Sequence, residues 1–133
     1  MMDPLVPLLL SLSPAIRYVA VYRNGQLSMD QRRGLAQASR AESDRYEELL
    51  VNPALLGLTA ARGAIDCGGL DYVLVRYGHF FQLLHPIPGG HVSVALDPDR
   101  DALGVLPGIG DLLRRQGRRI IAPTSRASRG GLK

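Results

Sequence analysis

The chain has 133 residues, a length that fits one domain built around a single hydrophobic core. Hydrophobic residues make up 46% of it, which excludes a disordered protein, and its one cysteine, Cys67, excludes both an intrachain disulfide framework and a cysteine-based zinc site within one chain. The net charge of +4 is uneven: residues 114–133 carry seven basic and no acidic side chains, whereas the rest carries nine basic and twelve acidic ones. The mildly acidic body argues against a basic DNA-binding face.

The N-terminal segment MMDPLVPLLLSLSP is apolar, but its only early charge is Asp3, whereas a signal peptide needs a positive start. It also falls short of the roughly 20 apolar residues of a membrane helix. We expect a short packing helix with Asp3 as N-cap and Pro4 at the first helical position. A weak membrane or partner anchor is the alternative. Because cysteine is so scarce, we expect a reducing, cytoplasmic location.

Residues 16–22 are rich in β-branched and aromatic side chains and predict a strand. Asn24-Gly25 follows, which is a strong hairpin signal because both central residues must adopt positive φ. The returning strand is expected over about residues 26–30.

A helix is expected over residues 44–51, with Ser39 and Ser43 as candidate N-caps. Asn52-Pro53 interrupts this pattern. Asn is a good N-cap and Pro a good first helical residue, so we expect a kink or a second helix from Pro53 to about Arg62.

Three apolar runs then predict an antiparallel meander, over residues 70–77, 80–85 and 91–96. Gly78-His79 and residues 86–90 are the expected connections. A last helix is expected over about residues 101–116, and the composition beyond Gly117 predicts a flexible basic tail. The expected organisation is therefore a domain over residues 1–117 and a tail over residues 118–133.

The expected fold class is α+β, with a five-stranded antiparallel sheet flanked by helices in the order α-β-β-α-β-β-β-α. Strand runs such as Val73-Leu74-Val75 are apolar on both faces, so helices should cover at least part of both sides of the sheet.

This order resembles the roadblock / dynein light chain family, a branch of the profilin-like and longin-like folds, over about residues 5–117. The motifs that carry the resemblance are the hairpin Arg23-Asn24-Gly25-Gln26-Leu27, the helix Pro53–Arg62 before the meander, and the exit from Asp97-Pro98-Asp99 to Leu103-Gly104. The resemblance implies that the strand 70–77 lies at a sheet edge and that two copies pair through it and the helix 53–62.

The residues favour a homodimer independently, because segment 54–61 is apolar around most of its circumference and one sheet face cannot cover it. The alternative is that the N-terminal helix or residues 44–51 cover it within one chain. The predicted dimer interface comprises Leu55, Leu56, Leu58, Thr59, Arg62, Tyr72, Leu74 and Val75.

Chemistry-bearing residues are sparse. His85 and His91 flank the 86–90 loop and could face each other across paired strands, but a third metal ligand is not evident, so we expect two surface histidines. Cys67 has no neighbouring base, and we expect a buried or half-buried thiol.

The carboxylates Glu42, Asp44, Glu47 and Glu48 cluster at a helix start, where a solvated face interacting with the helix dipole is the expected role. The glycine-rich segment 104–110 lacks the residues of a phosphate-binding loop. We therefore predict no enzyme activity, no cofactor and no metal.

The predicted function is a non-catalytic dimeric scaffold. The resemblance implies regulation of a Ras-like small GTPase or assembly of a signalling or motility complex, as among bacterial members of the family. Two alternatives stay open: a small-molecule sensor of the PAS or GAF type, and contacts of the basic tail with nucleic acid or another anionic partner. The tail contacts would come from Arg114, Arg115, Arg118 and Arg119.

Overall fold

The computed structural model describes residues 2–35, 41–99 and 101–129, with side chains up to residue 117. It divides into two compact units, Met1–Ala102 and Leu103–Lys133. The second unit holds a 3₁₀ turn, Leu103–Val105, and the helix α4, Leu106–Arg129. The boundary between the two units falls before the last helix, whereas the sequence predicted a boundary after residue 117. This helix begins at Leu106 and not near residue 101, so Pro107 stands in its first turn, where proline is tolerated.

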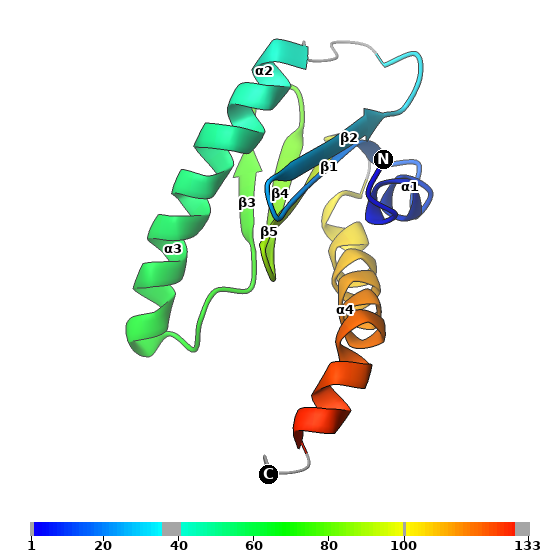
Figure 1. The fold of residues 1–133 in the computed structure, drawn as a ribbon. Coiled ribbons are helices and arrows are strands. Elements are labelled where there is room, and N and C mark those ends of the chain that lie inside the picture. The colour runs from blue at the N-terminus through cyan, green and yellow to red at the C-terminus, as the bar shows by residue number, and fades with distance from the viewer. Residues whose placement is uncertain (1, 36–40, 100, 130–133) are drawn as a thin grey trace. The chain divides into compact units, whose positions relative to one another are not determined.

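The first unit contains a five-stranded antiparallel sheet, and the predicted fold class is confirmed (Figure 1). The spatial order of the strands is β2-β1-β5-β4-β3, so β2 and β3 form the two edges. The strands are β1 (Ile16–Arg23), β2 (Gln26–Gln31), β3 (Val73–Arg76), β4 (Phe81–Ile87) and β5 (Gly90–Leu96).

Two tight turns shape this sheet. Asn24 and Gly25 have φ of 52° and 81°, as the hairpin signal predicted. The loop between β4 and β5 is shorter than the sequence suggested, since both strands extend to leave only Pro88 and Gly89. Gly90 has no room for a side chain, because a Cβ there would collide with the Tyr22 carbonyl oxygen on β1. The glycine therefore lets the central strands β1 and β5 approach closely.

Helix α1 (Leu5–Leu10) packs on β1 and β2. The helix begins at Leu5 with Pro4 as its N-cap, one residue later than predicted, and the Leu5 N–H donates to the Asp3 carboxylate at 3.0 Å. Asp3 also forms an ion pair with Arg23 at 2.9 Å, and its backbone N–H donates to Ser28 Oγ on β2. These contacts fix a helix of only six residues, which would be marginal alone, over the sheet. No helix in the described part of the chain is long and apolar enough to cross a membrane.

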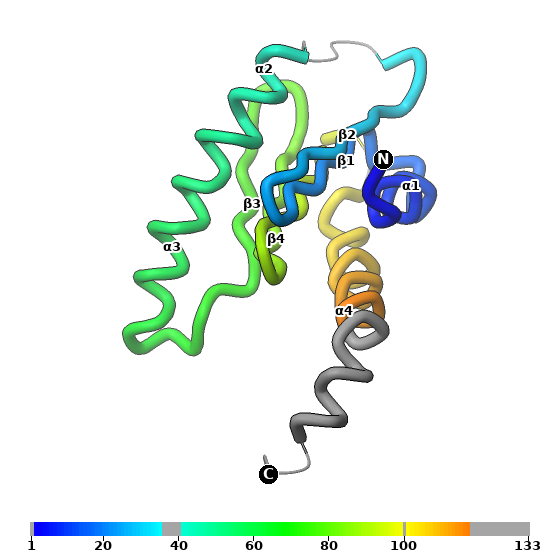
Figure 2. Tube along the Cα trace, in the orientation of Figure 1, coloured from blue at the N-terminus to red at the C-terminus, as the bar shows by residue number. Residues whose placement is uncertain are grey.

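The predicted interruption at Asn52-Pro53 is a change of helix type. Helix α2 (Ala41–Tyr46) continues through a π-helical segment, Glu47–Val51, into α3 (Asn52–Asp66), and the trace runs on without a break (Figure 2). The Asn52 N–H donates to the Glu47 carbonyl, five residues back. Proline removes a donor and crowds the preceding α-turn, and a wider turn relieves that conflict. The expected N-cap at Asn52 is therefore absent, whereas Ser39 lies outside the described residues.

The two faces of the sheet differ in chemistry. Because antiparallel partners share a face, the pairs Val19↔Val94 and Val21↔Val92 lie on one side. Ser28 pairs with Val21 and contacts Asp3, which places α1 on this apolar side. The fully buried apolar strand residues on it are Ile16, Val19, Val21, Leu83, Val92, Val94 and Leu96. The continuous helix α2–α3 covers the opposite side. The polar strand residues on that side alternate along each strand with the apolar residues of the α1 side.

Candidate functional site

A cluster of buried polar side chains lies between the π-helical segment and the sheet. Glu48 is fully buried at its centre. Its Oε2 accepts a hydrogen bond from the Tyr18 hydroxyl at 2.9 Å, and its Oε1 lies 2.8 Å from His91 Nε2. Asn52 Nδ2 donates to Oε1 at 2.9 Å. Glu48 is thus held by residues of its own helix and of both central strands, β1 and β5.

Ser93 extends this cluster along β5. Its hydroxyl oxygen accepts from Asn52 Nδ2 at 3.4 Å and from Gln82 Nε2 on β4. Buried polar groups are stable when they bond one another, and here the bonds link one helix to three strands. Asn52 Oδ1 alone is a buried side-chain oxygen without a partner among the described residues.

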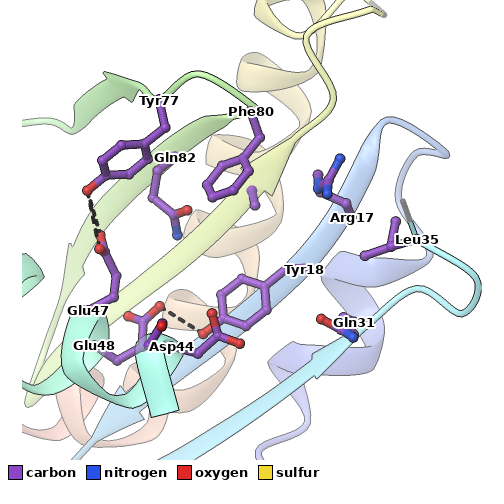
Figure 3. Close-up of a pocket in the computed structure, with 12 residues that line it drawn as sticks. Arg17, Tyr18, Gln31, Leu35, Asp44, Glu47, Glu48, Tyr77, Phe80 and Gln82 are labelled. Carbon is purple, nitrogen blue, oxygen red and sulfur yellow. Dashed lines mark hydrogen bonds between the residues drawn. The ribbon is translucent and has the colours of Figure 1, made fainter. Parts of the chain in front are cut away.

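A cavity of about 210 Å³ opens beside this cluster. Figure 3 shows the two tyrosine hydroxyls directed at glutamates of the helix, Tyr77 toward Glu47 and Tyr18 toward Glu48, with Arg17 and Leu35 on the other side. The walls of the cavity therefore combine aromatic rings with carboxylates. The lining residues are Arg17, Tyr18, Gln31, Leu35, Ser43, Asp44, Glu47, Glu48, Tyr77, Phe80, Gln82 and Ala95.

The ionisation of this site follows from burial and like charge. Burial, and then the Glu48 carboxylate, raise the pKa of Tyr18 far above its ordinary value. Burial and Glu47 raise the pKa of Tyr77 in the same way. Burial also raises the pKa of Glu47, against the opposing effect of the Tyr77 hydroxyl. Both phenols therefore stay protonated and donate to the carboxylates.

The two histidines considered as metal ligands cannot meet. His85 pairs with Val92 and His91 pairs with Pro86, so the two rings lie on opposite faces of the sheet. Both are buried, and the expectation of surface histidines was wrong, because β4 and β5 extend past them to Ile87 and Gly90. Within the described ranges no group of three or more His, Cys, Asp and Glu side chains is placed to hold a metal ion.

Two further expectations are corrected. Cys67 is exposed, at the position that directly follows the last residue of α3. Glu48 does not belong to a solvated acidic face, because the π-helical turn directs it at β1 and β5. Glu42 does lie exposed on α2, as expected.

The predicted interface residues occupy α3 and the region of β3. Leu56 is buried and packs toward the sheet, because it lies two helical turns after Glu48 on the same side of the helix. Leu58 is 74% exposed, and Arg62 is exposed in an ion pair with Asp66. The others, half-buried except for the more exposed Tyr72, are Leu55, Thr59, Tyr72, Leu74 and Val75.

The predicted tail contacts lie on α4. Arg114 is exposed and forms an ion pair with Asp111, and Arg115 is exposed as well. The backbone of Arg118 and Arg119 belongs to the helix, and their side chains lie outside the described part of the chain.

Sequence reasoning missed the Glu48 cluster, although a signal was present. His91 and Ser93 alternate with Val92 and Val94 in a strand expected to have both faces covered. Polar residues buried in this way need hydrogen-bond partners. A helix that carries Glu48 and Asn52 four residues apart could have been identified as their source.

Comparisons with known proteins assign no family to this chain. No protein-family model matches this chain, and no curated protein matches it.

Proposed function

We propose that this protein is a non-catalytic interaction module that forms a symmetric homodimer through β3 and α3. The observation that carries the proposal is an apolar stripe on the side of α3 that faces away from the sheet. Leu58 and Ile65 are 74% and 75% exposed, and Leu50 in the π-helical segment is 60% exposed. The spacing of the stripe keeps it on one side of the helix. Its members are Leu50, Ala54, Leu58, Ala61 and Ile65.

The two edges of the sheet suggest where a second copy would pair. The edge strand β2 carries exposed Asp30 and Gln31, and polar or charged side chains discourage strand pairing at an edge. The other edge strand, β3, presents Val73, Leu74 and Val75 in succession. An antiparallel pair of β3 strands would join the two sheets and bring both α3 helices to one interface, in a twofold arrangement, which is the commonest symmetry among oligomers.

The resemblance to the roadblock family extends this proposal to a third component. A Ras-like small GTPase, or a signalling or motility complex, would dock on the paired module. We place the module in the cytoplasm, where the exposed thiol of Cys67 stays reduced. Affinity purification from the native cell tests this extension, and repeated recovery without any GTPase would contradict it.

Light scattering after gel filtration tests the dimer itself. The unmodified chain should have twice the monomer mass at micromolar concentration, and the double variant Leu58→Lys plus Ile65→Lys should have the monomer mass. Both positions are highly exposed, so each change should alter the free energy of unfolding by less than about 0.5 kcal/mol. The matched control is Leu8→Lys, an exposed leucine on α1, which should remain dimeric. A monomeric unmodified chain would refute the proposal.

A further inference from the structure

The cavity beside the π-helical segment has the walls of a cation site. Rings of Tyr18, Tyr77 and Phe80 contribute to its lining, and the carboxylate-bearing residues Glu47 and Glu48 lie on its helix side. A cation is attracted to the face of an aromatic ring when it lies within about 6 Å of the ring centroid. Aromatic rings beside a carboxylate are the combination that holds organic ammonium ions.

The carboxylates also orient and polarise these rings. The Tyr77 hydroxyl lies 3.2 Å from both oxygens of Glu47, and the Tyr18 hydroxyl lies 2.9 Å from Glu48 Oε2. A phenol that donates to a carboxylate gains electron density in its ring, which strengthens the attraction for a cation. Phe80 meets Tyr77 edge to face, with ring centroids 5.6 Å apart, so these two rings form a corner.

One cation of the chain already uses this aromatic wall. The Arg17 guanidinium carbon lies 5.4 Å from the Phe80 ring centroid. Arg17 also forms an ion pair at 2.9 Å with Asp97, a residue outside the cavity that Arg32 shares. The helix side contributes three carboxylate-bearing residues to the lining, Asp44, Glu47 and Glu48, against this one guanidinium.

Glu47 is the carboxylate best placed to meet a ligand. It is half-buried, and the structure gives it one hydrogen-bond donor among the described residues, Tyr77, whereas a carboxylate has about four acceptor positions. The raised pKa of Glu47 reflects the cost of holding this charge in a partly buried position near other carboxylates. A bound cation would offset that cost.

The size and chemistry of the cavity limit what it can hold. The volume of about 210 Å³ lies below the range of roughly 300–1,000 Å³ that holds drug-sized ligands, so the cavity suits a small ligand. Magnesium and calcium prefer a shell of oxygen ligands, which aromatic rings do not provide. An alkylated ammonium ion fits better, because its methyl or methylene groups contact the rings, Leu35 and Ala95 while its charge faces Glu47.

We propose that this cavity binds a small organic ammonium ion, with its charged nitrogen between the Tyr77 and Tyr18 rings and the Glu47 carboxylate. The site belongs wholly to the Met1–Ala102 unit and shares no lining residue with the α3 stripe or β3. The two proposals therefore rest on different side chains.

Isothermal titration calorimetry of the full chain with choline and with n-butylammonium tests the proposal. The first probe carries a quaternary nitrogen and the second a primary one, so the two titrations distinguish these forms of the ligand. The matched control is 3,3-dimethylbutan-1-ol, in which carbon replaces the charged nitrogen of choline. At least one ammonium should bind, and the neutral alcohol should bind about tenfold more weakly or not at all. Equal binding of choline and the alcohol, or no ammonium binding up to about 10 mM, would overturn the proposal.

Two variants locate the binding. Glu47→Gln removes the charge but retains an acceptor for Tyr77, and it should weaken ammonium binding about tenfold. Glu42→Gln, which changes an exposed carboxylate on α2 outside the cavity, should leave binding unchanged. Thermal unfolding of both variants checks that each is folded. Equal affinity of the folded Glu47→Gln variant and the unmodified chain would refute the role of the cavity.

Discussion

The two faces of one sheet are buried by different means. On the α1 side, Val19 of β1 pairs with Val94 of β5, and both side chains are fully buried among aliphatic neighbours. At the adjacent pair, Ala20 of β1 faces Ser93 of β5, and the face under α2–α3 holds the bonded cluster around Glu48. The first face depends on packing and tolerates changes of shape poorly. The second depends on satisfied hydrogen bonds, and it tolerates the loss of a partner poorly.

Among changes to the two faces, removal of Glu48 is expected to cause the largest loss in the free energy of unfolding. Glu48→Ala leaves Tyr18, Asn52 and His91 without their shared acceptor, so the free energy of unfolding should fall by about 3–5 kcal/mol. Urea unfolding followed by circular dichroism measures it. Glu42→Ala on the exposed side of α2 is the control and should change this free energy by less than about 0.5 kcal/mol. A loss below about 1 kcal/mol for Glu48→Ala would show that the cluster is not a stabilising network.

A hydroxyl placed on the apolar face should have the next largest effect. Val94→Thr keeps the shape of the side chain but buries an oxygen among Val19, Leu83 and other aliphatic groups. The free energy of unfolding should fall by about 1–3 kcal/mol. The same urea titration of Ser93→Thr, which retains a hydroxyl on the polar face, provides the comparison. If Val94→Thr proved as stable as the unmodified chain, the contrast between the two faces would be lost.

The smallest expected effect is a pH-dependent difference in stability between Glu47→Gln and the unmodified chain. The folded-state pKa of Glu47 is raised above its ordinary value of 4.5, so the folded chain binds more protons than the unfolded chain between these two values. Stability contributed by the protonated form is therefore lost as pH rises through this window. Glu47→Gln removes that loss and should become more stable relative to the unmodified chain as pH rises from about 4 to about 7.

Urea titrations at both pH values measure this difference, with Glu42→Gln as the control that should show no such trend. If the relative stability of Glu47→Gln fell with rising pH, the pKa of Glu47 would be lowered by folding, in contradiction to its buried position.

The fold class and most of the strands could be predicted because their signals are local. Asn24-Gly25 identified the first hairpin, and runs of β-branched, aromatic and other apolar residues identified the strands. The polar face could not be predicted in the same way, because its bonds join residues far apart in the chain. His91 and Glu48 are separated by 43 positions, and Tyr18 and Glu48 by 30. On local evidence alone, Glu48 resembles any exposed acid near a helix start.

The Asn52-Pro53 pair shows a second limit of local patterns. Both residue types are common at helix starts, and the sequence therefore predicted a kink or a new helix. The structure instead accommodates Pro53 with a wide turn, because Asn52 is needed beneath the helix to bond Glu48 and Ser93. The requirement came from tertiary contacts, which local propensity does not report.

The wide turn at Glu47–Val51 joins the two halves of the long helix. A π-helical turn accommodates one residue more than an α-turn over about the same rotation, so excising one residue here would restore α-helical spacing and leave Asp44 and Leu56 on their present sides of the helix. Such a deletion would keep every strand and both helical halves intact. It would nevertheless take a residue from the turn in which two successive carboxylates, Glu47 and Glu48, both reach tyrosines of the sheet side, so an α-turn in its place could not present both.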